Sequence, residues 1–215
     1  MPVFFIDKMN IVNRTAALTG SDAEHIAKVL RLVPGDELSI CDGEGTEYEG
    51  RIISADTRAV VAALSEGCPS QTEPKLRVTL CQAIAKGQKM DSIVRRAVEL
   101  GASRIIPIFT ERVVSLPKDE AKKAERWQGI AREAAGQSRR GRIPRVDKPV
   151  DFGDALMAAE GLLLIPTTES VLARPIKDVL GEYPKSESIS VFIGPEGGFT
   201  AAEVEAAVQK GALPV

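Results

Sequence analysis

Residues 1–66 alternate short apolar runs with turn-forming residues, a pattern typical of a small β domain. Ser21 and Glu24 have the spacing of a capping box, which predicts a helix from Ser21 to about Leu32. The glycines and aspartates between the apolar runs predict tight turns. We predict strands at Val3–Ile6, Glu37–Cys41, Glu47–Ser54 and Arg58–Leu64, which together form a small barrel.

From residue 76 onward, strand-like apolar runs alternate with helix-like stretches. Apolar residues recur at helical spacing from Met90, and Gly101 stands where a helix-terminating glycine belongs. A second capping box, Thr200 with Glu203, opens a helix that closes at Gly211. This alternation predicts a parallel sheet covered on both faces. The other predicted helices are Lys118–Ser138 and Pro175–Leu180, and the predicted strands are Leu76–Ala85, Arg104–Thr110, Gly161–Pro166 and Ser188–Ile193.

Residues 67–75 carry two prolines among Ser, Gln and Thr, a composition typical of a linker. We therefore predict two domains, a β-barrel at residues 1–70 and an α/β domain at residues 71–215. After the last predicted helix only Leu213, Pro214 and Val215 follow, where the alternation predicts another strand. We expect the second domain to lack its C-terminal segment.

The formal net charge of −2 hides an uneven distribution. Residues 86–148 hold 16 Lys and Arg against 8 Asp and Glu, a local net charge of +8, so the rest of the chain carries −10. This asymmetry favours a basic surface that binds a polyanion. The alternative is a solvated loop with surface ion pairs. The densest part holds Arg139, Arg140, Arg142 and Arg145.

Composition excludes several classes of function. One histidine, His25, and three scattered cysteines rule out a Cys/His zinc site and most His-based triads, so we expect no metal. We interpret Cys41 and Cys81 as buried, Trp127 as a packing residue, and His25 as more often structural than catalytic. No apolar run approaches the roughly 18 residues of a membrane helix, and the N-terminus lacks the features of a signal peptide. We therefore expect a cytoplasmic protein with no membrane partner.

Two loops are candidates for chemistry, Pro166–Thr168 and Gly194–Gly198, because ligands of open α/β sheets bind at the carboxyl ends of strands. The second loop has three glycines in five residues, which lets its backbone approach a ligand closely. It lacks the Gly-Lys-Ser/Thr ending of a P-loop, and the Glu196 carboxylate would repel phosphate. A carboxylate suits a ligand with hydroxyls or positive charge, such as a nucleoside that carries a sulfonium and an amino group. A tight turn without any ligand is the alternative.

The motifs together resemble the RsmE family, SPOUT-class methyltransferases that modify N3 of a uridine in 16S ribosomal RNA. Gly-Pro-Glu-Gly-Gly at Gly194–Gly198 marks the SPOUT class. The Lys-Gly-x-Lys-Met segment at Lys86–Met90 and the Gln-Ser and Arg-x-Arg-x-Pro segment at Gln137–Pro144 narrow the resemblance to RsmE. The resemblance covers nearly the whole chain, in family order and at family-like spacing. The segments that carry it are His25–Arg31 with Pro34–Asp36, Lys86–Met90 with Val98–Gly101, Pro107–Arg112, Gln137–Pro144 and Ile193–Phe199.

The resemblance implies an N-terminal PUA-like barrel, a C-terminal α/β domain with a trefoil knot, and a homodimer that acts on 16S rRNA within the small ribosomal subunit. It also implies S-adenosylmethionine as the cofactor. The implied cofactor site is Leu164, Ile165, Pro166, Thr167, Ile193, Gly194, Pro195, Glu196, Gly197 and Gly198. The candidate RNA-binding residues are Lys28, Arg31, Lys86, Lys89, Arg139, Arg140 and Arg142.

Uridine N3 is not nucleophilic until its proton leaves, and an arginine can stabilise the resulting anion. Our hypothesis is that Arg140 approaches the target nucleotide as the catalytic residue, while Arg139 and Arg142 hold phosphate. A rival interpretation is a non-catalytic RNA-binding protein with a degenerate methyltransferase domain. A nucleotide-dependent enzyme that cradles phosphate in the glycine loop is weaker, because of Glu196.

Overall fold

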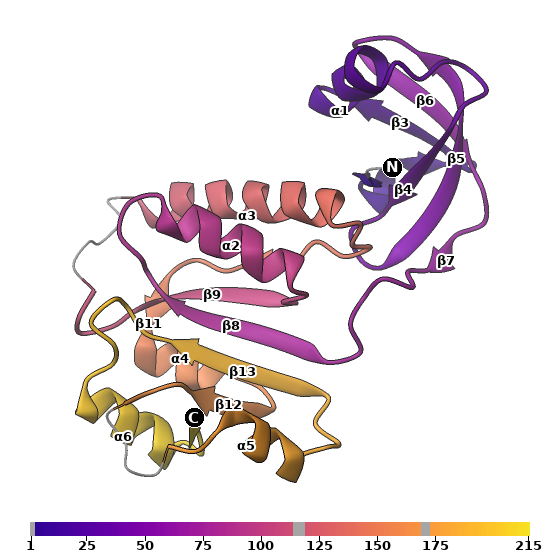
Figure 1. The fold of residues 1–215 in the computed structure, drawn as a ribbon. Coiled ribbons are helices and arrows are strands. Elements are labelled where there is room, and N and C mark those ends of the chain that lie inside the picture. The colour runs from indigo at the N-terminus through magenta and orange to yellow at the C-terminus, as the bar shows by residue number, and fades with distance from the viewer. Residues whose placement is uncertain (1–2, 114–118, 169–172) are drawn as a thin grey trace. The chain divides into compact units, whose positions relative to one another are not determined.

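The structure, a computed structural model, describes residues 3–113, 119–168 and 173–215. The chain divides into two compact units (Figure 1). Unit 1 comprises residues 1–73 and 135–143, and unit 2 comprises residues 74–134 and 144–215. Each unit has its own sheet and its own core, and each is described by itself.

Unit 1 is built on a mixed sheet with the strand order β1-β4-β5-β6-β3-β2. β1 runs parallel to β4, and the other neighbouring pairs are antiparallel. Alternate residues such as Leu38 and Ile40 point inward and fill an apolar core. The strands are β1 (Val3–Phe5), β2 (Ile11–Val12), β3 (Thr15–Thr19), β4 (Glu37–Cys41), β5 (Thr46–Ala55), β6 (Ala59–Leu64) and β7 (Cys68–Pro69), which pairs with β5. The four predicted strands are confirmed, and β2, β3 and β7 were not predicted.

The helical segment of unit 1 differs from its prediction. The predicted capping box at Ser21 is wrong, because Gly20 is the N-cap, at φ +64°, and no side chain caps the helix. Glu24 bonds instead to Lys28 Nζ at 3.1 Å, one turn further along. A short 3-10 helix η1 (Lys8–Asn10) precedes α1 (Ser21–Glu24), which continues as a π-helix, η2 (His25–Leu30). It ends before the predicted Leu32 because Arg31 takes a left-handed conformation, φ +55°.

The arginine-rich segment 135–143 belongs to unit 1, although it lies far along the chain. The Gly45 amide donates to the Gly141 carbonyl at 3.1 Å, and the Ile143 amide donates to Gly43 at 3.0 Å. Gly141 lies so close to Ser70 that a Cβ there would meet the Ser70 side chain at 2.3 Å. The sequence-based division at residue 70 did not include this segment in the first domain.

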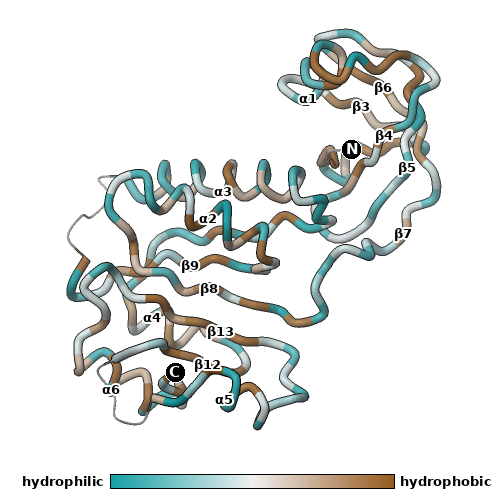
Figure 2. Tube along the Cα trace, in the orientation of Figure 1, coloured by the Kyte–Doolittle hydropathy of each residue, from teal (hydrophilic) through white to brown (hydrophobic). Residues whose placement is uncertain are grey.

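Unit 2 has an entirely parallel sheet in the order β10-β9-β8-β13-β12-β14, with β11 also paired to β9. The predicted parallel sheet is therefore confirmed. β12 and β13 consist largely of hydrophobic residues (Figure 2). The strands are β8 (Arg77–Ala83), β9 (Arg104–Phe109), β10 (Arg145–Val146), β11 (Val150–Asp151), β12 (Leu162–Ile165), β13 (Ser188–Ile193) and β14 (Leu213–Pro214).

Helices lie on both sides of this sheet, with α2 and α3 on one side and α4 and α6 on the other (Figure 1). Phe192 of β13 packs with Phe152 of α4 and Val204 of α6 in one apolar cluster. The capping box of Thr200 with Glu203 is confirmed at the start of α6. The helices are α2 (Lys89–Glu99), α3 (Glu120–Gln137, whose last residues lie in unit 1), α4 (Phe152–Ala158), α5 (Ile176–Glu182) and α6 (Ala201–Gln209). α4 was not predicted, and Lys118, the predicted start of α3, lies outside the described residues.

The residues after α6 form the strand that the alternation calls for. β14 pairs parallel with β12, with Leu213 opposite Leu164 and Pro214 opposite Ile165. The Val215 amide donates to the Ile165 carbonyl, and the Thr167 amide donates to the Val215 carbonyl. These bonds fix the loop that follows β12. Across the described residues, no helix is long and apolar enough to cross a membrane.

Candidate functional site

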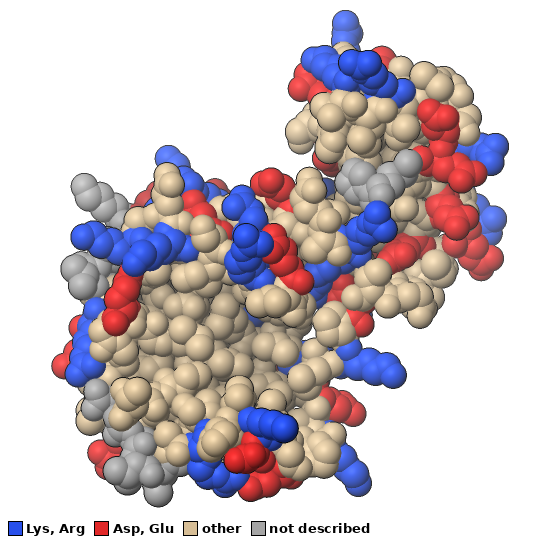
Figure 3. All heavy atoms as spheres, viewed as in Figure 1, with Lys and Arg blue, Asp and Glu red and all other residues tan. Residues whose placement is uncertain are grey.

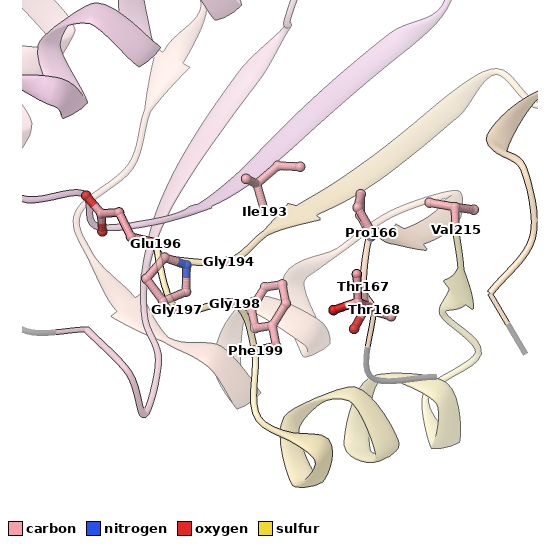
Figure 4. Close-up of a pocket in the computed structure, with 11 residues that line it drawn as sticks. Pro166, Thr167, Thr168, Ile193, Gly194, Glu196, Gly197, Gly198, Phe199 and Val215 are labelled. Atoms are coloured by element: carbon pink, nitrogen blue, oxygen red, sulfur yellow. The ribbon is translucent and has the colours of Figure 1, made fainter. Parts of the chain in front are cut away.

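A pocket of about 640 Å³ opens where β12 and β13 end (Figure 4). Its two walls are the loop after β12 and the glycine-rich loop between β13 and α6. This is the edge at which open α/β sheets bind their ligands, and the volume is ordinary for a small-molecule site. The lining residues are Pro166, Thr167, Thr168, Ile193, Gly194, Pro195, Glu196, Gly197, Gly198, Phe199 and Val215.

The glycine loop folds back on itself, and this requires glycine at two positions. A Cβ on Gly194 would lie 3.1 Å from the Gly198 carbonyl carbon and from the Phe199 nitrogen. Gly198 has φ +69°, a conformation that side-chain-bearing residues rarely adopt. The Gly198 amide donates to the Pro195 carbonyl at 2.9 Å and closes the turn. Gly197 is different, since a Cβ there would make an ordinary contact of 3.5 Å with Arg112 Cδ.

Two cations from other elements bind this loop. Lys89, the first residue of α2, donates from Nζ to Glu196 Oε1 at 2.8 Å. Hydrogen bonding to Lys89 lowers the pKa of the Glu196 carboxyl below its usual range. Arg112, shortly after β9, donates from one guanidinium nitrogen to the Gly197 carbonyl at 2.6 Å and to the Phe199 carbonyl at 3.1 Å. No pattern in the sequence indicates the contact made by Arg112.

Of the ten predicted cofactor-binding residues, eight line the pocket. Leu164 and Ile165 do not line it, because their side chains are buried in two apolar clusters on either side of β12. Phe199 and Val215 were missed, and Thr168 belongs to a predicted candidate loop but not to the predicted cofactor-binding residues. Thr168 and Phe199 directly follow predicted cofactor-binding residues, so their place in the sequence could have identified them. Val215 reaches the pocket through the pairing of β14 with β12, which the sequence does not show.

The candidate RNA-binding residues fall in both units. Lys28, Arg31, Arg139 and Arg142 lie in unit 1, where all four are exposed, although Lys28 is paired with Glu24. Lys86 and Lys89 lie in unit 2 and are exposed as well. Basic side chains gather with acidic ones over α2 and α3 of unit 2 (Figure 3).

Arg140 is not exposed like its neighbours. Its side chain is only 6% exposed, and it pairs with Glu73, with a Nη2 to Oε2 distance of 2.6 Å and a bond from Nε to Oε1 of 3.3 Å. Glu73 Oε1 also accepts the backbone amide of Arg142 at 3.1 Å. The carboxylate thus holds the arginine segment from two points. The structure places the predicted catalytic side chain inside unit 1, where it does not face solvent.

Four side chains that the sequence suggested as structural are packed. Cys41 and Cys81 are fully buried, and desolvation is the main reason why the pKa of each thiol rises to about 12. Trp127 is buried in unit 2. His25 makes an edge-to-face contact with Phe4, with ring centroids 5.8 Å apart. None of these side chains is among those that line the pocket.

Two protein families match the chain. The RNA methyltransferase domain family matches residues 72–215, and the RNA methyltransferase PUA domain family matches residues 18–65. The first match contains every residue that lines the pocket, and the second contains β4, β5 and β6 of unit 1 and the end of β3.

Similar proteins cover nearly the whole chain. The ribosomal RNA small subunit methyltransferase E of Synechocystis sp. is 36% identical over 95% of this chain and 67% of its own length. The enzyme of the same name from Bacillus subtilis is 33% identical over 89% of this chain and 77% of its own. A crystal structure of the Neisseria gonorrhoeae enzyme bound to S-adenosyl methionine has a TM-score of 0.88 and 28% identity, and covers 100% of this chain and 88% of that one.

Proposed function

Because the chain belongs to the ribosomal RNA small subunit methyltransferase E (RsmE) family, we propose that it methylates N3 of a uridine in 16S ribosomal RNA, with S-adenosylmethionine as the methyl donor. The observation that carries this proposal is the pocket at the ends of β12 and β13, with its glycine loop. The relative with a TM-score of 0.88 binds S-adenosyl methionine in its crystal structure. A small-subunit RNA substrate would place the protein in the cytoplasm.

The residues of the pocket fit such a ligand. Gly194, Gly197 and Gly198 leave backbone exposed, so that amides and carbonyls can reach hydroxyl and amino groups. Glu196 stays ionised through the neutral range, which suits a ligand that carries positive charge. Ile193 and Phe199 supply apolar surface. When bound, S-adenosylmethionine would supply a sulfonium methyl group, and its transfer to the N3 anion would break the methyl–sulfur bond and release S-adenosylhomocysteine.

The protein's own contribution is to orient the reactants and to exclude water, as in other reactions where proximity supplies most of the acceleration. The proton on uridine N3 has to leave before the nitrogen can react. Arg140 was our candidate for stabilising that anion, but its contact with Glu73 favours a structural role. We therefore propose that exposed Arg139 and Arg142 contact RNA phosphate, and that Arg140 holds the segment on which they stand.

We propose Lys28 and Arg31 of unit 1 and Lys86 of unit 2 as further RNA contacts, each on its own unit, because all three are exposed. We propose that Lys89 also attracts RNA by its charge, in addition to its contact with Glu196 of the cofactor pocket. We also propose that the protein acts as a homodimer on the assembled small subunit. Light scattering after size-exclusion chromatography tests the dimer, and a monomeric mass at micromolar concentration contradicts it.

The test of the activity is methyl transfer to small ribosomal subunits purified from a strain that lacks the modification. We expect S-adenosylmethionine-dependent incorporation, recovered as N3-methyluridine when the digested nucleosides are analysed by mass spectrometry. Free 16S rRNA, assayed in parallel, shows whether the particle is required. Methylation at another atom contradicts the assignment of N3. Tight RNA binding with neither cofactor binding nor transfer supports the non-catalytic RNA-binding protein instead.

A further inference from the structure

The glycine loop cannot hold its own shape through side chains, because three of its five residues between Gly194 and Gly198 are glycines. Glycine loses more conformational freedom on ordering than any other residue. A loop of this composition that lines a ligand pocket therefore needs contacts from outside to stay in one conformation before the ligand arrives. Such preorganisation improves affinity by lowering the cost of ordering on binding.

Arg112 supplies contacts of this kind. Its guanidinium donates to the carbonyls of Gly197 and Phe199, which lie on either side of Gly198. Because a peptide unit is planar, fixing its carbonyl also fixes the direction of the following amide. The amide that follows Gly197 belongs to Gly198 and donates to the Pro195 carbonyl. The amide that follows Phe199 belongs to Thr200 and donates to Glu203. The peptide units Gly197–Gly198 and Phe199–Thr200 are thus each held through both the carbonyl and the amide.

A second bond ties the same segment to α6. The backbone amide of Glu111, next to Arg112, donates to Glu203 Oε1 at 2.9 Å. Glu203 is also the residue whose other carboxylate oxygen completes the capping box with Thr200. Glu111 and Arg112 therefore bracket the end of the glycine loop and the start of α6.

We propose that Arg112 is a positioning residue that holds the glycine loop in its cofactor-binding conformation through the carbonyls of Gly197 and Phe199. The proposal rests on the function proposed above for the cofactor it names, while its claim about the loop concerns the free protein. Arg112 acts through the backbone, and it is not among the residues that line the pocket. Both bonds come from a single guanidinium nitrogen, so a lysine ammonium, which carries three N–H donors at the end of a shorter side chain, is a partial substitute.

Lys89 does not do the same work. Its partner is the side chain of Glu196, and both groups are more than half exposed. A contact between two mobile, solvated side chains orders little backbone. Arg112 binds the backbone itself, so its removal releases the main chain.

The test compares three single variants with the unmodified protein. Arg112→Ala removes the contact, Arg112→Lys restores the charge, and Arg95→Ala removes a matched exposed arginine from α2 of the same unit. Hydrogen exchange by mass spectrometry, without ligand, follows the peptide that contains Gly194–Phe199. Calorimetry measures the Kd for S-adenosylmethionine, and steady-state kinetics measure its KM and kcat.

We expect Arg112→Ala to accelerate exchange in this peptide and to raise the Kd and KM for S-adenosylmethionine roughly tenfold, with kcat at saturation and the thermal midpoint little changed. Arg112→Lys should recover part of the affinity, and Arg95→Ala should match the unmodified protein. Unchanged exchange and a Kd within about twofold in Arg112→Ala overturn the inference while the proposed function stands. Faster exchange in Arg112→Ala, in a chain whose unmodified form binds no S-adenosylmethionine, supports the role of Arg112 in the loop and contradicts the proposed function.

Discussion

Each unit of the protein contains an ion pair between a basic side chain and a glutamate, and the two pairs differ chiefly in burial. In unit 2, Lys89 and Glu196 are 65% and 54% exposed. In unit 1, Arg140 and Glu73 are 6% and 16% exposed. Exposed pairs contribute roughly 0–1 kcal/mol, whereas removing one partner of a buried pair leaves an uncompensated charge that costs about 3–5 kcal/mol. The exposed pair beside the pocket can therefore be broken at little cost in stability, whereas the buried pair under the arginine segment supports the fold.

The same difference in burial separates arginines that are neighbours in the sequence. Arg139, Arg140 and Arg142 look alike in the sequence, but only the middle one is buried. Arg139 has φ +57°, which turns the chain between two side chains of opposite exposure. Local charge density thus identifies a candidate RNA-binding segment without showing which of its arginines reach the RNA.

Replacing Arg140 with alanine is the change with the largest expected effect. It leaves the largely buried Glu73 carboxylate without its cation, so we expect urea denaturation to show a loss of up to about 3–5 kcal/mol in the free energy of unfolding. Methylation of small subunits should fall in step with the folded fraction.

Two variants control this experiment. Arg139→Ala, at the neighbouring exposed position, should change stability by less than about 0.5 kcal/mol. The double variant Glu73→Leu with Arg140→Met should recover much of the loss, because it leaves neither charge unpaired. An Arg140→Ala protein of unchanged stability that has lost methyl transfer would return Arg140 to the catalytic role.

The sequence predicted most of the fold because the signals involved are local. Apolar periodicity placed the central strands and helices of unit 2 to within a few residues, and the Thr200 capping box was correct. The capping box at Ser21 failed because a glycine with positive φ can replace a side-chain cap, and spacing alone does not show this. The predicted pocket was largely recovered for the same local reason, since it follows from where two strands end.

What the sequence could not show depends on contacts between distant segments. Arg140 and Glu73 are 67 positions apart, and Arg112 lies 85 positions from Gly197. Periodicity and motif spacing carry no information about such pairs. The burial of Arg140 and the contact of Arg112 with the loop emerge only when the chain folds.

Gly194→Ala tests the pocket in unit 2, whose shape depends on backbone geometry and not on a buried charge. The added Cβ would lie 3.1 Å from two backbone atoms of the same loop, which cannot yield as a flexible side chain can. We expect S-adenosylmethionine affinity to fall by about 1–3 kcal/mol, roughly 5- to 150-fold, as measured by calorimetry.

Gly197→Ala is the matched control, because its Cβ would make only ordinary contacts with the Arg112 side chain, 3.5 Å from Cδ and 3.8 Å from Cβ. Its affinity should stay within about threefold of the unmodified protein. Equal affinity in both variants would show that the turn at Gly194 does not shape the binding site.

The exposed arginines of unit 1 should carry affinity for RNA without carrying stability. Removing Arg139 and Arg142 together deletes two proposed phosphate contacts, so the slope of log affinity against log salt should become shallower by about 1–2 units. Filter binding to a 16S rRNA fragment at several salt concentrations measures it, with the free energy of unfolding as the control. An unchanged slope contradicts phosphate contact by this segment.

The exposed pair beside the pocket should show the smallest effect, a shift in titration. Hydrogen bonding to Lys89 lowers the pKa of Glu196 below 4.5, so the contribution of the ionised carboxylate is present above pH 4.5 and is lost as the pH falls through the lowered value. In Lys89→Ala the pKa should rise toward 4.5, which carbon-detected NMR of the Glu196 carboxyl can follow, whereas Lys210→Ala, beyond the end of α6, should leave it unchanged. Because both side chains are well exposed, stability at pH 7 should hardly change. A large loss of stability in Lys89→Ala would mean that burial does not separate the two pairs, and the contrast between the two units would fail at its premise.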